Sequence, residues 1–123
     1  YLGVSIAGFP NMFVIAGPGS PSVLSNVVHS IETHVNWLSD LLERTRAQGI
    51  QRIEAEQAHE DKWVDHVNEA ANQTLYPVGN SWYVGANMPG KPRVFMPYAA
   101  GVPAHRRIIE RVPEKNYEGF AQV

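Results

Sequence analysis

The chain of 123 residues contains no cysteine, which excludes a disulfide framework and any thiolate metal ligand. It has no apolar run near the roughly 20 residues of a membrane span, and its start lacks the basic and apolar regions of a signal peptide. With 10 basic and 12 acidic residues its formal net charge is −2, which argues against non-specific nucleic-acid binding. We therefore expect a cytoplasmic protein that binds neither membranes nor nucleic acid.

Metal-ligating residues are sparse as well. His59 and His66 lie about two helical turns apart and can share a helix face, and Glu69 follows His66 by three positions. A third ligand and the H-E-x-x-H spacing are missing, so we expect no metal site. The remaining composition, 44% hydrophobic and 18% charged residues, is typical of a globular protein with one core.

The first half of the chain predicts a buried strand followed by a long helix. The continuous apolar run Met12–Ala16 is typical of a strand covered on both faces, and the glycine- and proline-rich residues 17–22 end it. A helix capped by Ser20 or Ser22 should then extend to Gly49. Its expected buried stripe consists of Leu24, Val27, Val28, Ile31, Val35, Leu38, Leu41 and Leu42.

The second half predicts a short extended piece at 50–54, a helix at 58–75, a short strand at 93–96 and a helix at 103–111. The second helix should bury Trp63, Val67, Ala70 and Ala71. One buried strand needs neighbours that this sequence does not provide. We therefore expect the chain to be part of a longer polypeptide, with the remainder upstream of Tyr1.

Residues 17–22, Gly-Pro-Gly-Ser-Pro-Ser, lie between the expected strand and helix and partly imitate a dinucleotide-binding fingerprint. The third glycine is missing, because Ser22 occupies its place, and no acidic residue ends a second strand. A plain turn is the favoured interpretation. The alternative is that the helix start stabilises a negatively charged group such as a reduced flavin.

The stretch Asn80–Tyr98 combines three prolines and two glycines with four aromatic residues between helical segments. Irregular stretches with large apolar side chains are commonly lids or binding loops. Trp82 and Tyr83 can stack on a planar ligand, and Lys91 and Arg93 can meet phosphate or carboxylate. The alternative is that the aromatic side chains only anchor the loop; the density of glycine, proline and aromatic residues favours closure over a ligand.

Several strings of the sequence resemble the C-terminal part of type I Baeyer–Villiger monooxygenases. They are G-F-P-N-M-F at 8–13, A-G-P-G-S-P-S at 16–22, T-L-Y-P at 74–77 and W-Y-V-G-A-N-M-P-G-K-P-R-V-F at 82–95. The resemblance implies an α/β flavoprotein with two dinucleotide-binding domains that uses FAD, NADPH and O2 to insert one oxygen atom beside a ketone carbonyl, giving an ester or lactone. It implies that residues 1–49 end the FAD-binding domain with one strand and a long helix. Residues 50–123 would be a mostly helical C-terminal extension with a mobile, cofactor-closing loop at 77–98.

The resemblance also implies roles for single residues. Val27, where many relatives have Met, matches the position whose backbone approaches FAD, and Trp82 matches the loop tryptophan that contacts NADP. The turn Ser22, Val23 and Leu24 matches the lining of the ketone pocket. The glycine fingerprints and the catalytic arginine of the family match nothing here, so we expect no catalytic residue in this segment and no activity from it alone.

Two alternatives stay open. A sister flavin monooxygenase that oxidises nitrogen or sulfur is disfavoured by the loop string, and products from a ketone or an amine would separate the two. A non-catalytic ligand-binding module that retains the aromatic loop would be favoured by an upstream sequence without both glycine fingerprints.

Overall fold

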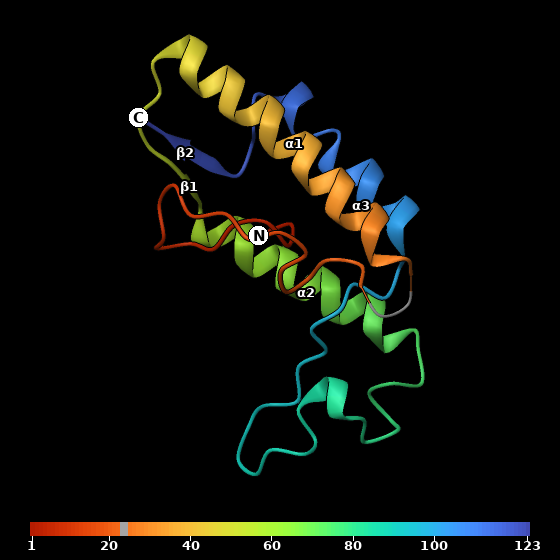
Figure 1. Ribbon diagram of the computed structural model, residues 1–123. Helices are drawn as coiled ribbons and strands as arrows, with labels where there is room; N and C mark the ends of the chain where they lie inside the picture. Colours follow the sequence, from red (N-terminus) through yellow and green to blue (C-terminus); the bar gives the residue numbers. More distant parts are fainter. Residues whose placement is uncertain (23–24) are drawn as a thin grey trace.

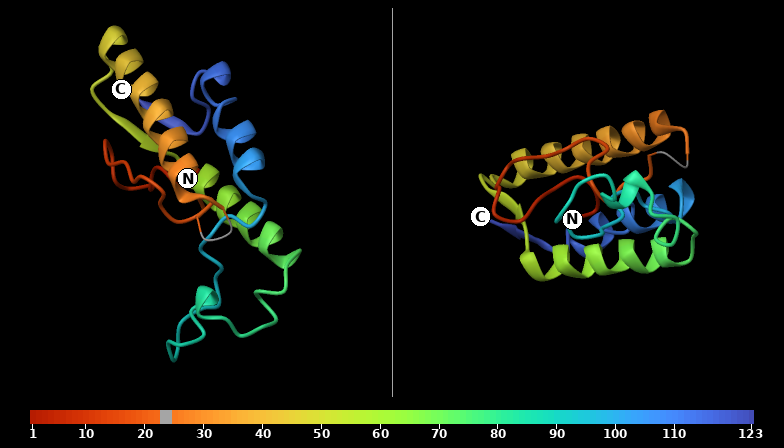
Figure 2. Two further views of the ribbon diagram at one scale, coloured as in Figure 1. Left: turned by 45° about the vertical axis from the view of Figure 1, so that its right-hand side comes forward. Right: turned by 90° about the horizontal axis from the view of Figure 1, so that it is seen from below.

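The computed structural model describes residues 1–22 and 25–123. Its regular elements within these ranges are the helices α1 (Val27–Gln48), α2 (Gln57–Asn72) and α3 (Val102–Ile109) and the strands β1 (Ile53–Ala55) and β2 (Phe120–Gln122). Two short 3-10 turns, η1 (Trp82–Val84) and η2 (Pro113–Lys115), complete them. Helices α1 and α3 lie side by side, and the irregular segment 1–22 lies between α1 and α2 (Figures 1 and 2). The described helices include none long and apolar enough to cross a membrane.

Helix α1 begins later than predicted. Its cap is Asn26, whose side-chain oxygen accepts a hydrogen bond from the Val28 N–H at 3.1 Å, so the prediction of Ser20 or Ser22 as the cap was wrong. The Ser20 hydroxyl instead donates to the Gly17 carbonyl. The predicted end is confirmed, because Gly49 adopts the left-handed conformation with φ +68° that ends many helices.

The buried face of α1 also differs from the predicted stripe. The residues that it buries are Ser30, His34, Trp37, Leu41 and Thr45. Among the described residues of the predicted stripe only Leu41 is fully buried and Leu38 is partly buried, whereas Val27, Val28, Ile31, Val35 and Leu42 are all more than a third exposed. Leu24 lies outside the described residues. The prediction relied on the spacing of aliphatic side chains. The face of α1 that packs consists mainly of Trp37, His34 and the hydroxyl residues Ser30 and Thr45.

The predicted strand Met12–Ala16 is not formed. Within this run only Phe13 makes a bridge, antiparallel to Ser5, and the Val14 N–H donates to the Val4 carbonyl at 2.9 Å. Met12 and Ile15 are each 38% exposed rather than buried. A strand covered on both faces needs paired neighbours, and the described part of the chain offers this run a single residue pair.

The small two-stranded sheet pairs a segment just after α1 with the C-terminal residues of the chain. Strand β1 is antiparallel to β2, with Ile53 opposite Gln122 and Ala55 opposite Phe120. The expected extended piece at 50–54 is thus found as a shorter strand that begins three residues later and ends one residue later, while the predicted strand at 93–96 has no ladder. The bounds of helices α2 and α3 differ from the predicted ones by at most three residues. Helix α2 buries Trp63, Val67 and Ala71 as expected, whereas Ala70, also expected there, is only partly buried.

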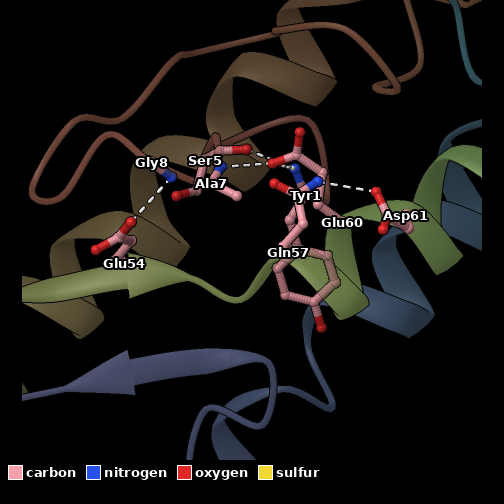
Figure 3. A network of polar contacts seen from close by, with 8 residues as sticks. All are labelled: Tyr1, Ser5, Ala7, Gly8, Glu54, Gln57, Glu60 and Asp61. Atoms are coloured by element: carbon pink, nitrogen blue, oxygen red, sulfur yellow. Dashed lines mark hydrogen bonds and ion pairs between the residues drawn. The ribbon is translucent and has the colours of Figure 1, made fainter.

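The core joins residues from both sides of Gly49. Leu2, Trp37 and Leu41 pack with Ile53, Trp63, Ile109 and Phe120 in one cluster. The N-terminal segment is further held by carboxylates: the Ala7 N–H donates to Glu60 Oε2, and the Gly8 N–H donates to Glu54 Oε1 at 2.9 Å (Figure 3). These bonds satisfy backbone donors of a segment that lacks regular structure.

Candidate functional site

The aromatic loop leaves the end of α2 and projects away from the three helices (Figure 1). At its centre, η1 is capped by Ser81, whose hydroxyl accepts a hydrogen bond from the Tyr83 N–H, and ends at Gly85 with φ +74°. Trp82 is 64% exposed and lies against Tyr83, with ring centroids 3.9 Å apart. A large aromatic side chain held on a short turn and exposed to this degree can stack on a planar ligand.

The other aromatic residues of the loop anchor it. Phe95 and Val84 are buried in a small cluster with Ala71 of α2. Tyr83 packs edge-on against Tyr76, with ring centroids 5.5 Å apart. The anchoring interpretation therefore holds for Tyr83 and Phe95, and Trp82 alone remains available for a ligand.

The basic residues of the loop, Lys91 and Arg93, are exposed, and neither makes an ion pair within the described residues. Their placement leaves them accessible to an anion, but no acceptor in the described chain fixes their direction. They are weaker candidates for a ligand contact than Trp82.

The glycine turn, which we define as residues 17–22, is shaped by contacts within the chain. A Cβ atom on Gly19 would lie 2.6 Å from Trp63 Nε1, and one on Gly17 would lie 2.9 Å from the Gly3 carbonyl oxygen. The space that a missing side chain leaves is therefore filled by the protein itself, as expected for a plain turn rather than a phosphate cradle. Ser22, at the end of this turn, is half-buried.

The predicted flavin contact Val27 is the first residue of α1 and is 41% exposed. The first turn of α1 has no acidic side chain to offset the positive end of the helix dipole. Of the predicted pocket residues, Val23 and Leu24 lie outside the described residues. Hydrogen bonds bring the glycine turn together with Met96 and Tyr98 of the loop, while Trp82 lies on the projecting part.

The chain is similar over nearly its whole length to monooxygenases, although no protein-family model matches it. It is 40% identical over 117 residues to a Baeyer–Villiger monooxygenase of Pseudooceanicola batsensis, covering 95% of the chain and 21% of the relative. It is 36% identical to the cyclohexanone 1,2-monooxygenase of an Acinetobacter species, covering 98% and 22%. A phenazine N-monooxygenase of Lysobacter antibioticus is 37% identical, covering 98% and 22%.

Solved structures of monooxygenases are similar to the chain as well. A closed cyclohexanone monooxygenase superposes with a TM-score of 0.92 at 39% identity, over 100% of this chain and 23% of that protein. An oxidised steroid monooxygenase bound to NADP superposes with a TM-score of 0.89 at 42% identity, over 100% and 22%.

The chain is homologous to part of the Baeyer–Villiger monooxygenases. It spans about a fifth of the length of these relatives. The resemblance found in the sequence is thereby confirmed, and so is the fold class: mixed helices with little sheet that match a piece of such an enzyme.

One cluster in this chain was missed by sequence reasoning. His34 of α1 and His105 of α3 are fully buried, with ring centroids 5.2 Å apart. The Ala16 N–H donates to His34 Nδ1 at 3.0 Å, and His105 Nε2 donates to the Leu2 carbonyl at 2.9 Å. Two histidines so far apart in sequence carry no periodic signal that could have paired them.

Burial controls the charge of both rings. Desolvation, with a smaller contribution from His105, lowers the pKa of His34 to about 4, and desolvation also lowers the pKa of His105 against the opposing effect of its bond to Leu2. Both imidazoles are therefore neutral at pH 7. They link the N-terminal segment to α1 and α3 without placing charge in the core.

Proposed function

We propose that the chain is the C-terminal part of a flavin-dependent Baeyer–Villiger monooxygenase, in which it closes the cofactor site and lines the ketone pocket. The observation that carries the proposal is the match of nearly the whole chain, including its projecting aromatic loop, to enzymes named for this reaction. In this proposal residues 1–49 complete an FAD-binding domain, and residues 50–123 form an extension with the loop at 77–98. The proposal includes a cytoplasmic location and a remainder of the polypeptide upstream of Tyr1.

The exposed surface of α1 supports the existence of a larger polypeptide. Val28, Ile31, Val35 and Leu42 follow each other at spacings of three, four and seven along the helix and are 38–54% exposed. Such a contiguous apolar stripe is typical of a surface that packs against another part of a protein. A gene that encodes only these 123 residues would contradict the proposal.

Some residues of this chain are suited to contact FAD and NADPH. Trp82 is exposed on its turn and can lie against a nicotinamide, and Val27 offers an exposed helix start without acidic neighbours. The space beside Gly19 in the glycine turn is occupied by Trp63, so this turn is not suited to hold a pyrophosphate. We assign the pyrophosphate site to the remainder of the polypeptide. When bound, NADPH would supply the reducing power, and the reduced FAD would activate O2, which is the source of the inserted oxygen atom.

The contribution of this chain is then binding and exclusion of water. Closure of the Trp82 loop would cover the nicotinamide and keep solvent from the reacting groups. The half-buried Ser22, together with Val23 and Leu24, would line the side of the pocket where the ketone lies. Because these groups orient and shield but do not react, the isolated segment is expected to be inactive.

A second candidate function is oxygenation of a ring nitrogen. Its support is that the phenazine N-monooxygenase is 37% identical to this chain, as similar as the cyclohexanone enzyme at 36%. Identity over this segment thus does not separate the two substrate classes.

In the deciding experiment the full-length polypeptide is loaded with FAD and supplied with NADPH and O2. It then receives either cyclohexanone or phenazine as substrate. We expect lactone from the ketone at a rate well above N-oxide from the phenazine. N-oxide without lactone would favour the second function, and a cofactor-loaded protein that oxygenates neither phenazine nor any of a panel of cyclic and linear ketones would contradict both.

A further inference from the structure

Two segments that are distant in the sequence are joined by a pair of backbone hydrogen bonds. The Gly19 N–H donates to the Met96 carbonyl at 2.7 Å, and the Tyr98 N–H donates to the Ser20 carbonyl at 3.0 Å. The glycine turn is therefore paired with residues 95–98, which we call the return limb of the loop. Ser20 is 1% and Tyr98 2% exposed, so the bond between these two residues lies inside the protein, and its loss would leave backbone groups without water.

The side chain of Tyr98 fixes the glycine turn and the return limb on helix α2. The ring is 2% exposed and stacks on Trp63, with centroids 5.4 Å apart and an angle of 23° between the planes. Its hydroxyl is joined to His66 Nε2 by a hydrogen bond of 2.8 Å. Trp63 in turn lies directly against Gly19. One residue thus holds the turn by its backbone and α2 by its ring and hydroxyl.

The two parts of the loop are held unequally. Phe95 and Tyr98 of the return limb are both 2% exposed, although Met96 between them is 54% exposed. In the projecting part Val78, Trp82 and Met88 are 84%, 64% and 47% exposed, and Val84 is buried. Segments with few buried contacts open at low free energy. Movement of the loop should therefore be easiest at the exposed residues of the projecting part, while the buried Val84, Phe95 and Tyr98 hold its base.

We propose that Tyr98 is a positioning residue: it locks the glycine turn and the return limb to α2, so that the wall of the substrate pocket and the base of the Trp82 loop keep one geometry. This inference rests on the proposed function, in which Ser22 lines the pocket and Trp82 contacts the nicotinamide. Tyr98 itself touches neither group. It acts through the two backbone bonds that run from its limb to the turn.

The test is Tyr98→Phe in the full-length, FAD-loaded enzyme, which removes the hydroxyl and retains the ring stack on Trp63. The KM for the ketone should rise about five-fold, the factor that corresponds to one neutral hydrogen bond. The fraction of NADPH oxidised without oxygenated product should increase as well. The matched control is Tyr117→Phe, which removes a hydroxyl from another buried tyrosine, packed on Trp37 away from the loop, and should change neither quantity.

His66→Leu provides a second, independent variant, because it removes the same bond from the other side. It should reproduce both effects, and the double variant with Tyr98→Phe should be no worse than either single one. Unchanged ketone KM and unchanged NADPH use in Tyr98→Phe, with ester still formed by the wild type, would overturn the inference even if the melting temperature fell. A wild type that forms no ester would instead contradict the proposed function.

Discussion

The neutral histidine pair makes stability depend on pH in a calculable way. His34 titrates near pH 4 in the folded chain and near 6.5 in the unfolded chain. Between these values the unfolded state binds more protons, so the free energy of unfolding rises with pH. From the two pKa values, His34 alone should remove about 2 kcal/mol between pH 7 and pH 5.

Burial is the main cause of the lowered pKa of His34, with a smaller contribution from His105, and two groups contact its ring. They are the backbone N–H of Ala16 from the N-terminal segment and the imidazole of His105 from α3, and neither supplies a negative charge. His105 adds a loss of the same sign, because its pKa is lowered too. The pH window of 5 to 7 lies above the range in which ordinary carboxylates titrate, at about 4.

The assay is urea unfolding of the 123-residue chain at intervals from pH 5 to pH 7.5. His34→Asn places an amide oxygen close to the position of Nδ1, so it can still accept from the Ala16 N–H but cannot be protonated. This variant should lack about 2 kcal/mol of the acid-dependent loss. His29→Asn, on the exposed side of the same helix, should retain the full loss. Equal pH dependence in the wild type and His34→Asn would refute the reasoning.

Two further predictions concern the turn and the loop. Gly19→Ala should destabilise the chain by about 2–4 kcal/mol, since it combines a left-handed backbone with a clash against Trp63, whereas Gly49→Ala, left-handed but with open space, should cost only about 1–2 kcal/mol; equal losses in urea unfolding would remove the clash from the account. Trp82→Ala in the full-length enzyme should leave FAD bound while less of the NADPH consumed yields product; unchanged coupling together with unchanged NADP affinity would exclude a closing role.

Prediction from sequence succeeded where a local signal was strong. Gly49 as a helix end and the buried face of α2 around Trp63 follow from residue type and spacing. The strand at Met12–Ala16 failed because its formation depends on partners that the described residues do not contain. The stripe on α1 failed because an apolar face can equally be turned toward a neighbouring part of a larger protein.

The candidate site likewise has one feature that the sequence predicts and others that only the fold shows. The string around Trp82 is specific enough to be recognised from the sequence alone, and the exposure of that side chain agrees with a role in ligand contact. The bonds from Gly19 to Met96 and from Tyr98 to Ser20 connect residues more than seventy positions apart. Only the folded chain reveals them, because no pattern of periodicity or spacing pairs a turn with a distant loop.

We propose that this chain serves a monooxygenase that inserts oxygen beside a ketone carbonyl. The most direct test of this proposal is to give the full-length, FAD-loaded polypeptide NADPH, cyclohexanone and ¹⁸O₂, and to measure the mass of the product. We predict a lactone that carries one ¹⁸O atom for each NADPH consumed in coupled turnover. NADPH oxidation by a folded, FAD-loaded protein without any labelled ester or lactone, across a panel of cyclic and linear ketones, would contradict the account.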